Sequence, residues 1–181
     1  MGGGDKGLRF YQGVRLLDAV MARIAPQAGA IALNANGDPA RFSAFGLPVL
    51  PDTLSESVAP QPGPLAGILA AMDWAAAQGA SHVLTVPTDS PHLPVDLVAR
   101  LHAALPHAEA VVMAASADGT AHPVIALWPS AAASALRGAL AQGQRRVRAF
   151  AQSLDLVMVP FPASDPDPFT NINHSAEVAA P

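Results

Sequence analysis

The sequence contains no cysteine, which excludes disulfide bonds, thiolate metal sites and a cysteine nucleophile. Only 13% of its residues are charged, and its ten Lys and Arg residues form no cluster. A general nucleic-acid-binding surface is therefore not expected, because such a surface neutralises several phosphates together. No apolar run approaches the roughly 20 residues that span a bilayer, and the N-terminus resembles no signal peptide. We expect a cytoplasmic protein with neither a nucleic-acid nor a membrane partner.

Apolar residues, by contrast, make up 51% of the 181 residues, and the net charge is −4. This composition excludes an intrinsically disordered chain, which combines low hydrophobicity with high charge. The length fits one domain with a sizeable core, and no linker or internal repeat divides it. We predict a single domain over residues 1–181.

Helical and strand patterns alternate along the chain. Apolar spacing predicts helices at residues 14–24, 64–78, 95–105, 130–141 and 145–154. Short apolar runs predict strands at residues 30–33, 47–50, 82–86, 110–114, 124–128 and 156–159. This alternation is typical of an α/β sheet with helices on both faces. Such sheets bind ligands at the carboxyl ends of their strands, which directs attention to residues 34–36, 52 and 87–92.

Asp89 is the most informative carboxylate at that edge. It follows the clearest buried strand and stands between Pro87 and Pro91, which stiffen its loop. Mg²⁺ prefers oxygen ligands, often one or two carboxylates together with substrate phosphates. The alternative is that Asp89 only helps to initiate the helix predicted from residue 95. Asp52 follows another predicted strand and could approach the same edge, although a turn aspartate is the simpler interpretation of it alone.

Two glycine-rich segments could bind phosphate or a base. Residues 2–7 match G-x-G-x-x-G in letters, but no strand precedes them, and the residue after Lys6 is not the Ser or Thr of a Walker A loop. The backbone of Gly2 and Gly3 beside Lys6 could still cradle a triphosphate, and an unstructured N-terminus is the alternative. Residues 62–67 open a predicted helix with small residues that admit a flat base, or that only cap the helix.

The remaining polar candidates are weaker. The six histidines show no metal-ligand spacing, so surface or packing roles are expected for them. No G-x-S-x-G elbow occurs, so a serine hydrolase has no support. Arg145 and Arg146 stand near a predicted helix start, where a guanidinium suits phosphate or carboxylate; a solvated helix end is the alternative.

Taken in order, these segments resemble the molybdenum cofactor guanylyltransferases. The matching segments, as they stand in this chain, are MGGGDKGL at 1–8, NAN at 34–36, Asp52, PGPLAG at 62–67, PTDSP at 87–91, HPVIAL at 122–127, GQRRV at 143–147 and FTNIN at 169–173. They span nearly the whole chain. The resemblance implies a Rossmann-like nucleotidyltransferase with a three-layer α/β/α arrangement and a mostly parallel sheet.

The resemblance also implies an activity and a set of site residues. Such an enzyme transfers GMP from Mg²⁺-bound GTP to the terminal phosphate of molybdenum-molybdopterin and releases pyrophosphate. The implied GTP-binding residues are Gly2, Gly3, Lys6, Asn34, Asp52, Gly63 and Asp89, of which Lys6 and Asp89 are also catalytic and Asp89 binds Mg²⁺. The implied molybdopterin-side residues are His122, Arg145, Arg146, Asn171 and Asn173. Possible partners are other cofactor-biosynthesis proteins or recipient molybdoenzymes, and a monomer is expected.

The chain departs from the family pattern at its start. The family begins with a β-strand that runs into a glycine-rich L-A-G-G-x-S-x-R-M-G loop, whereas this chain begins at the M-G of that loop. We therefore expect the first strand and half of the phosphate loop to be missing, either through a misassigned start or in a genuinely short form. The expected gap lies in the middle of the sheet.

Two other functions stay open. A cytidylyltransferase acting on the same cofactor, or another nucleotidyltransferase of this fold, would share most of these residues; the Asp5-Lys6-Gly7-Leu8 segment favours guanylyl transfer, because cytidylyl relatives usually carry a K-L-L-type sequence there. A non-catalytic cofactor-binding protein is the second alternative, since half of the phosphate loop is expected to be missing.

Overall fold

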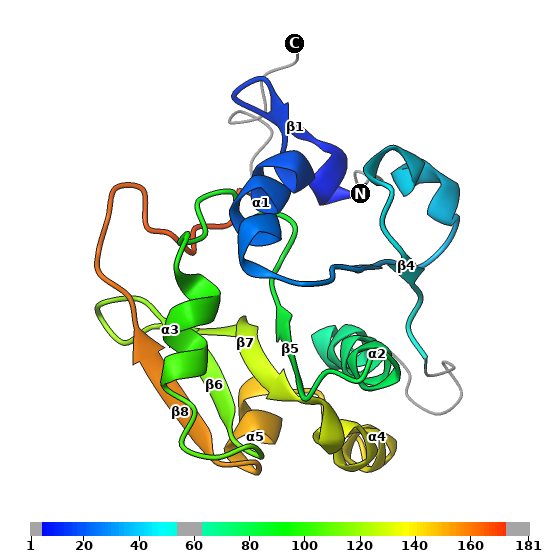
Figure 1. The fold of residues 1–181 in the computed structure, drawn as a ribbon, viewed down its shortest axis with the longest axis vertical. Helices are drawn as coiled ribbons and strands as arrows, with labels where there is room; N and C mark the ends of the chain where they lie inside the picture. Colours follow the sequence, from blue (N-terminus) through cyan, green and yellow to red (C-terminus); the bar gives the residue numbers. More distant parts are fainter. Residues whose placement is uncertain (1–4, 54–62, 173–181) are drawn as a thin grey trace.

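The computed structural model describes residues 5–53 and 63–172, in which a mixed sheet is covered by helices (Figure 1). The strand order in this sheet is β5 (His82–Thr85), β7 (Ala121–Pro129), β6 (Val111–Ala115) and β8 (Leu156–Pro160). β7 pairs antiparallel with β5 and β6, whereas β6 and β8 are parallel, so β5, β6 and β8 share one direction. Their carboxyl ends therefore lie at one edge, where sheets of this class bind ligands.

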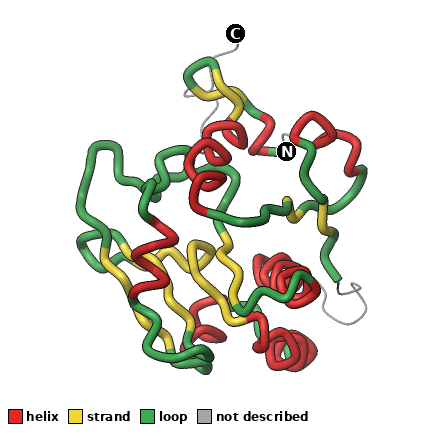
Figure 2. The backbone as a smooth tube through the Cα atoms, viewed as in Figure 1, coloured by secondary structure: helices red, strands yellow, loops and turns green. Residues whose placement is uncertain are grey.

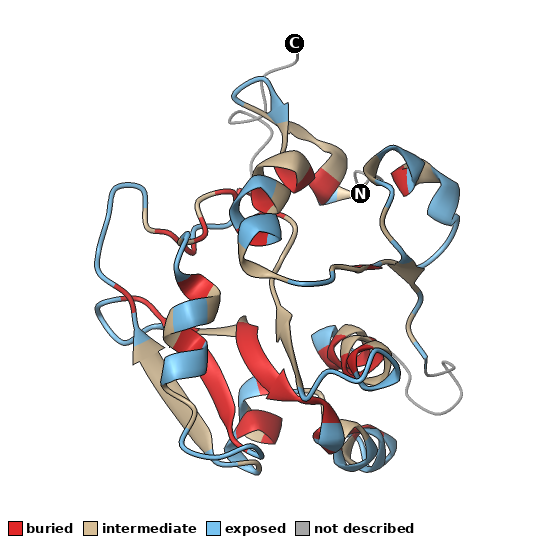
Figure 3. Cartoon of the chain, viewed as in Figure 1, coloured by how far each residue is buried: buried red, intermediate tan, exposed pale blue. Residues whose placement is uncertain are grey.

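Helices cover both faces of the sheet. One face carries α2 (Pro64–Ala77), α4 (Ala133–Ala141) and α5 (Val147–Gln152), and the other carries α1 (Leu16–Ile24) and α3 (Leu97–Ala103). All of β6 is buried, and Figure 3 shows it in red between the layers. Trp128 of β7 is fully buried and stacks on Phe150 of α5, with ring centroids 6.3 Å apart. The three-layer α/β/α arrangement implied by the resemblance is confirmed.

The N-terminal part adds two short ladders (Figure 2). β1 (Phe10–Tyr11) and β2 (Val14–Arg15) form an antiparallel hairpin, and β3 (Leu33–Asn34) pairs in parallel with β4 (Val49–Leu50). Short 3-10 turns occupy Lys6–Leu8, Ala25–Gln27, Pro39–Phe45 and Ser130–Ala132. In the described ranges no helix is long and apolar enough to cross a membrane.

Some predicted boundaries were wrong where backbone pairing competes with the apolar pattern. The helix predicted from residue 14 begins at Leu16, because Val14 and Arg15 pair with β1 instead. The strand predicted at 47–50 is reduced to Val49–Leu50. Pro48 has no N–H to donate to a ladder, although its carbonyl accepts a hydrogen bond from the Leu33 amide at 2.9 Å.

Candidate active site

Asp89 lies in the loop that follows β5, at the carboxyl edge of the sheet. Its side chain is buried, and its Oδ2 lies 3.4 Å from the Nζ of Lys6, which is 83 residues away in sequence. The Lys6 side chain is 50% exposed, so it is accessible from solvent. The structure thus brings together the two residues that the sequence predicts to be catalytic.

Gly7 allows Lys6 to lie close to Asp89. A Cβ on Gly7 would lie 3.0 Å from the Cβ of Thr88, which is closer than side chains normally approach. The absence of a side chain lets the turn at Lys6–Leu8 pack directly on the loop after β5. Lys6 is held beside Asp89 as a result.

The C-terminal segment folds back onto the same loop. The Ile172 amide donates to the Asp89 carbonyl at 2.9 Å, and the Ser90 hydroxyl donates to Oδ1 of Asn171 at 2.7 Å. Ser90 is fully buried, whereas Asn171 is exposed. Asn171, a predicted molybdopterin-side residue, therefore lies beside the Asp89 loop.

A second polar group lies at the ends of β3 and β4. The Asn34 side-chain amide donates to Oδ1 of Asp52 at 3.1 Å and to the Leu50 carbonyl at 2.9 Å. Asn36 donates to Oδ2 of Asp52 at 2.8 Å, so two amides hold the carboxylate. The sequence placed Asn34 and Asp52 in one nucleoside-binding region, and the structure puts them in direct contact.

Gly67 in the first turns of α2 packs against this group. A Cβ on Gly67 would lie 2.3 Å from Oδ1 of Asn34, so no other residue fits without moving the Asn34 side chain. Gly63, at the start of the same helix, has φ of 61° and ψ of −154°, a conformation that favours glycine. Glycine is therefore favoured by packing at position 67 and by the backbone conformation at position 63.

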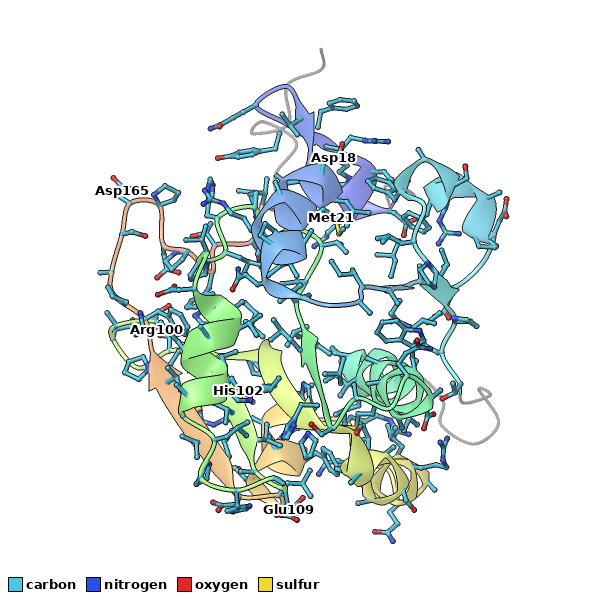
Figure 4. The ribbon with its side chains drawn as sticks, in the orientation of Figure 1. Asp18, Met21, Arg100, His102, Glu109 and Asp165 are labelled. Carbon is cyan, nitrogen blue, oxygen red and sulfur yellow. The ribbon has the colours of Figure 1, made fainter. Side chains whose placement is uncertain are left out.

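A cavity of about 800 Å³ is lined both by Asp89 and by Asn34, and so connects the Lys6–Asp89 pair with the Asn34–Asp52 contact. Its polar lining residues include Asn34, Thr88 and Asp89. Apolar side chains of α1, α2 and β5 also line it, among them Met21, which is labelled in Figure 4. β5 forms one edge of the four-stranded sheet, and β3 pairs only with β4 within the described part of the chain. The cavity lies between these two strands.

His122 lies in a different pocket, of about 470 Å³, at the carboxyl edge of β6 and β8. Its Nε2 is 2.7 Å from the Ser116 hydroxyl, and its ring packs on Phe169 with centroids 4.5 Å apart. Burial lowers the pKa of His122 below its usual value, which favours the neutral imidazole at pH 7.

The two predicted arginines have other contacts. The Arg145 guanidinium donates to the carbonyls of Leu140, in the last turn of α4, and Gln144 at 3.0 and 2.7 Å. Arg146 is exposed at the start of α5. Among the described residues, no hydrogen bond or ion pair joins either arginine to the Asp89 group, so their role toward a substrate stays a prediction.

Gly2, Gly3 and Asn173 lie outside the described residues. The sequence reasoning assigned no role to Ser116 or Asp167. Neither residue belongs to any of the motifs in the printed sequence. Gly67 was part of a recognised segment, but its packing against Asn34 depends on a neighbour 33 positions earlier in the printed sequence.

Comparisons with known proteins identify the family of this chain. Residues 1–157 match the family described as MobA-like NTP transferase domain. The chain belongs to this family. It is 48% identical over 182 residues to a molybdenum cofactor guanylyltransferase of Rhodopseudomonas palustris (strain BisB5), covering 99% of this chain and 85% of the relative. A protein of the same name from Acidiphilium cryptum (strain JF-5) is 45% identical over 181 residues, covering 99% of this chain and 86% of the relative.

Two solved structures share the fold. Molybdopterin-guanine dinucleotide biosynthesis protein A from Archaeoglobus fulgidus superposes with a TM-score of 0.68 at 18% identity, covering 97% of this chain and 88% of that one. A protein from Aquifex aeolicus VF5 gives 0.72 at 18% identity, covering 88% and 80%. At this identity the likeness establishes the fold, which is the nucleotidyltransferase fold that the sequence predicted.

Proposed function

We propose that this protein transfers GMP from GTP to the terminal phosphate of molybdopterin and releases pyrophosphate. The observation that carries the proposal is the Lys6–Asp89 pair, which places one cation and one buried carboxylate at the carboxyl edge of the sheet. The relatives at 48% and 45% identity, both named molybdenum cofactor guanylyltransferase, support the same activity. Recipient molybdoenzymes or other cofactor-biosynthesis proteins would then be its partners.

The donor set around Asp89 suits a magnesium ion shared with the substrate. In the described part of the chain, no group of three or more His, Asp or Glu side chains could hold a metal by itself. Mg²⁺ is commonly held by one or two carboxylates together with substrate phosphates and water, which a single buried aspartate can satisfy. When bound, the ion would neutralise phosphate charge; Asp89 would hold it and Lys6 would contact the phosphates beside it.

The reaction needs no nucleophile from the protein. An oxygen of the molybdopterin phosphate attacks the α-phosphorus of GTP, a new P–O bond forms, and the bond to the β-phosphate oxygen breaks, so pyrophosphate leaves with the electron pair. The protein must position the two phosphates and offset the charge on the leaving group. Lys6 supplies a positive charge at that place, and the loop of Asp89 and Ser90 is held rigid by the contacts of Asn171 and Ile172.

We place the nucleoside beside Asn34 and Asp52, with the segment from Gly63 to Gly67 at the guanine side. GTP selectivity is tested by incubating the protein with Mg²⁺, molybdopterin and α-labelled GTP or CTP. We expect label transfer from GTP alone. Equal transfer from CTP would support a cytidylyltransferase, and no transfer from either nucleotide would support a binding protein without turnover.

Gly67→Ala is expected to weaken GTP binding by about tenfold while the protein stays folded. The new methyl group would overlap Oδ1 of Asn34, whose amide holds Asp52. A change of about tenfold corresponds to the loss of one charge-assisted hydrogen bond. Calorimetric titration of GTP with Mg²⁺ measures the effect.

Gly138→Ala is the matched control for this substitution. Gly138 also lies inside a helix, α4, but a Cβ there meets nothing within 4 Å. We expect unchanged GTP affinity and a gain of roughly 0.5–1 kcal/mol in stability from the better helix propensity of alanine. If both variants bound GTP equally well, Asn34 would not contribute to the nucleoside site.

A further inference from the structure

The pocket at His122 has a chemistry unlike that of the phosphate site. Its lining includes the carboxylates of Asp118 and Asp167 and the hydroxyls of Ser116, Thr120 and Thr170, and no Lys or Arg among the described residues. A phosphate group would meet two negative charges there without a cation to offset them. A ligand rich in N–H donors suits the pocket instead, because ionised carboxylates only accept hydrogen bonds.

Asp167 is the better placed of the two carboxylates. Its Oδ1 accepts the Phe169 amide at 2.8 Å, which fixes the orientation of the group. Within the described part of the chain its Oδ2 has no hydrogen-bond partner. Asp118 is more exposed, and its Oδ1 is held by the Thr120 amide in a turn. Asp167 therefore offers a partly buried, oriented acceptor at the pocket wall.

His122 and Phe169 form another part of the pocket lining. The His122 ring is held by the Ser116 hydroxyl and by the face of buried Phe169. Asp167 lies close enough to His122 to oppose, electrostatically, the lowering of the imidazole pKa by burial. A flat heterocycle in this pocket would meet an aromatic side chain and a carboxylate together.

The pocket is close to the reacting centre and on the far side of it from the nucleoside. Thr170 lines the pocket, and the next two residues contact the Asp89 loop, a distance of at most about 7 Å along the chain. Asn34 and Asp52 lie on the β3–β4 side of β5, whereas this pocket is built on β6, β7 and β8. Two substrates can therefore approach Asp89 from opposite sides.

We propose that this pocket binds the ring end of the acceptor substrate, with Asp167 accepting hydrogen bonds from the amino group and adjacent ring N–H of an aminopyrimidinone such as that of a pterin. The inference rests on the proposed function, which supplies a phosphorylated pterin as acceptor. It goes beyond that function by naming Asp167 as the residue that selects the substrate ring. His122, Ser116 and Phe169 line the pocket that holds this ring.

The test compares pterin with lumazine, which carries a carbonyl in place of the amino group. Both are fluorescent, so binding to the full chain is followed by titration without turnover. We expect the native protein to bind pterin at least about tenfold more tightly than lumazine, because the carbonyl of lumazine would face the Asp167 carboxylate. In Asp167→Asn the side-chain amide can donate to that carbonyl, so the preference should disappear or reverse.

Asp165→Asn is the matched control, since it removes the same charge from the same loop. Asp165 is exposed on the outer bend of that loop (Figure 4) and does not line the pocket. The Asp165→Asn protein should keep the preference for pterin over lumazine. The proposal is overturned if neither compound binds, if Asp167→Asn keeps the native preference, or if GTP displaces the bound pterin by competition. An Asp167-dependent preference in a protein that transfers no GMP would instead refute the proposed function alone.

Discussion

Asp89→Asn is expected to lower GMP transfer by a factor of about 10² or more, the scale seen when a principal electrostatic stabiliser is removed. The substitution keeps the shape of the side chain but removes the negative charge that would hold Mg²⁺. The partner Lys6 is half exposed, so loss of this ion pair should change stability little. Transfer rates over a series of Mg²⁺ concentrations, with a thermal melt of each protein, measure both effects.

Asp96→Asn serves as the control for this loss of charge. Asp96 is exposed ahead of α3 and makes no side-chain cap hydrogen bond. Its variant should transfer GMP at the native rate. Near-native transfer by a well-folded Asp89→Asn protein would show that Asp89 does not hold the cation.

A strand supplied between β3 and β5 is expected to raise the melting temperature by about 5 °C or more. We propose that the sheet takes an additional central strand there, because the cavity between these strands has a mainly apolar lining and is about 800 Å³ in volume. Each buried backbone group left without a partner costs on the order of 1–3 kcal/mol. One kcal/mol shifts the melting temperature of a domain this size by roughly 2–4 °C.

The experiment joins an apolar strand and a glycine-rich loop ahead of Met1 and compares it with a Gly/Ser segment of equal length. The strand should raise both the melting temperature and the rate of GMP transfer, because it would fill the cavity and bring further amides to the phosphates. The Gly/Ser segment should raise neither. Equal stability and equal rates in the two proteins would mean that the cavity accepts no strand.

Much of the layer structure could be predicted from the sequence, since it depends on local pattern. The apolar spacing at 64–78 and the run at 82–86 correspond to α2 and β5 with small shifts at their ends. Asp89 could be singled out in the same way, because a carboxylate after a buried strand is a local feature. The family resemblance rests on the order of the motifs, and the preference for guanylyl over cytidylyl transfer rests on the segment Asp5-Lys6-Gly7-Leu8.

Contacts between distant segments were decided only in the tertiary structure. The direction of β7 cannot be read from its apolar run, because a strand shows the same alternation whichever way it runs. A side chain at Gly7 would collide with Thr88, and one at Gly67 would collide with Asn34. These neighbours are distant in sequence, so only the folded chain shows why glycine is needed at both positions. Asp167 acquires its place beside His122 because the C-terminal segment returns to the sheet edge, and no sequence pattern encodes where a returning loop will lie.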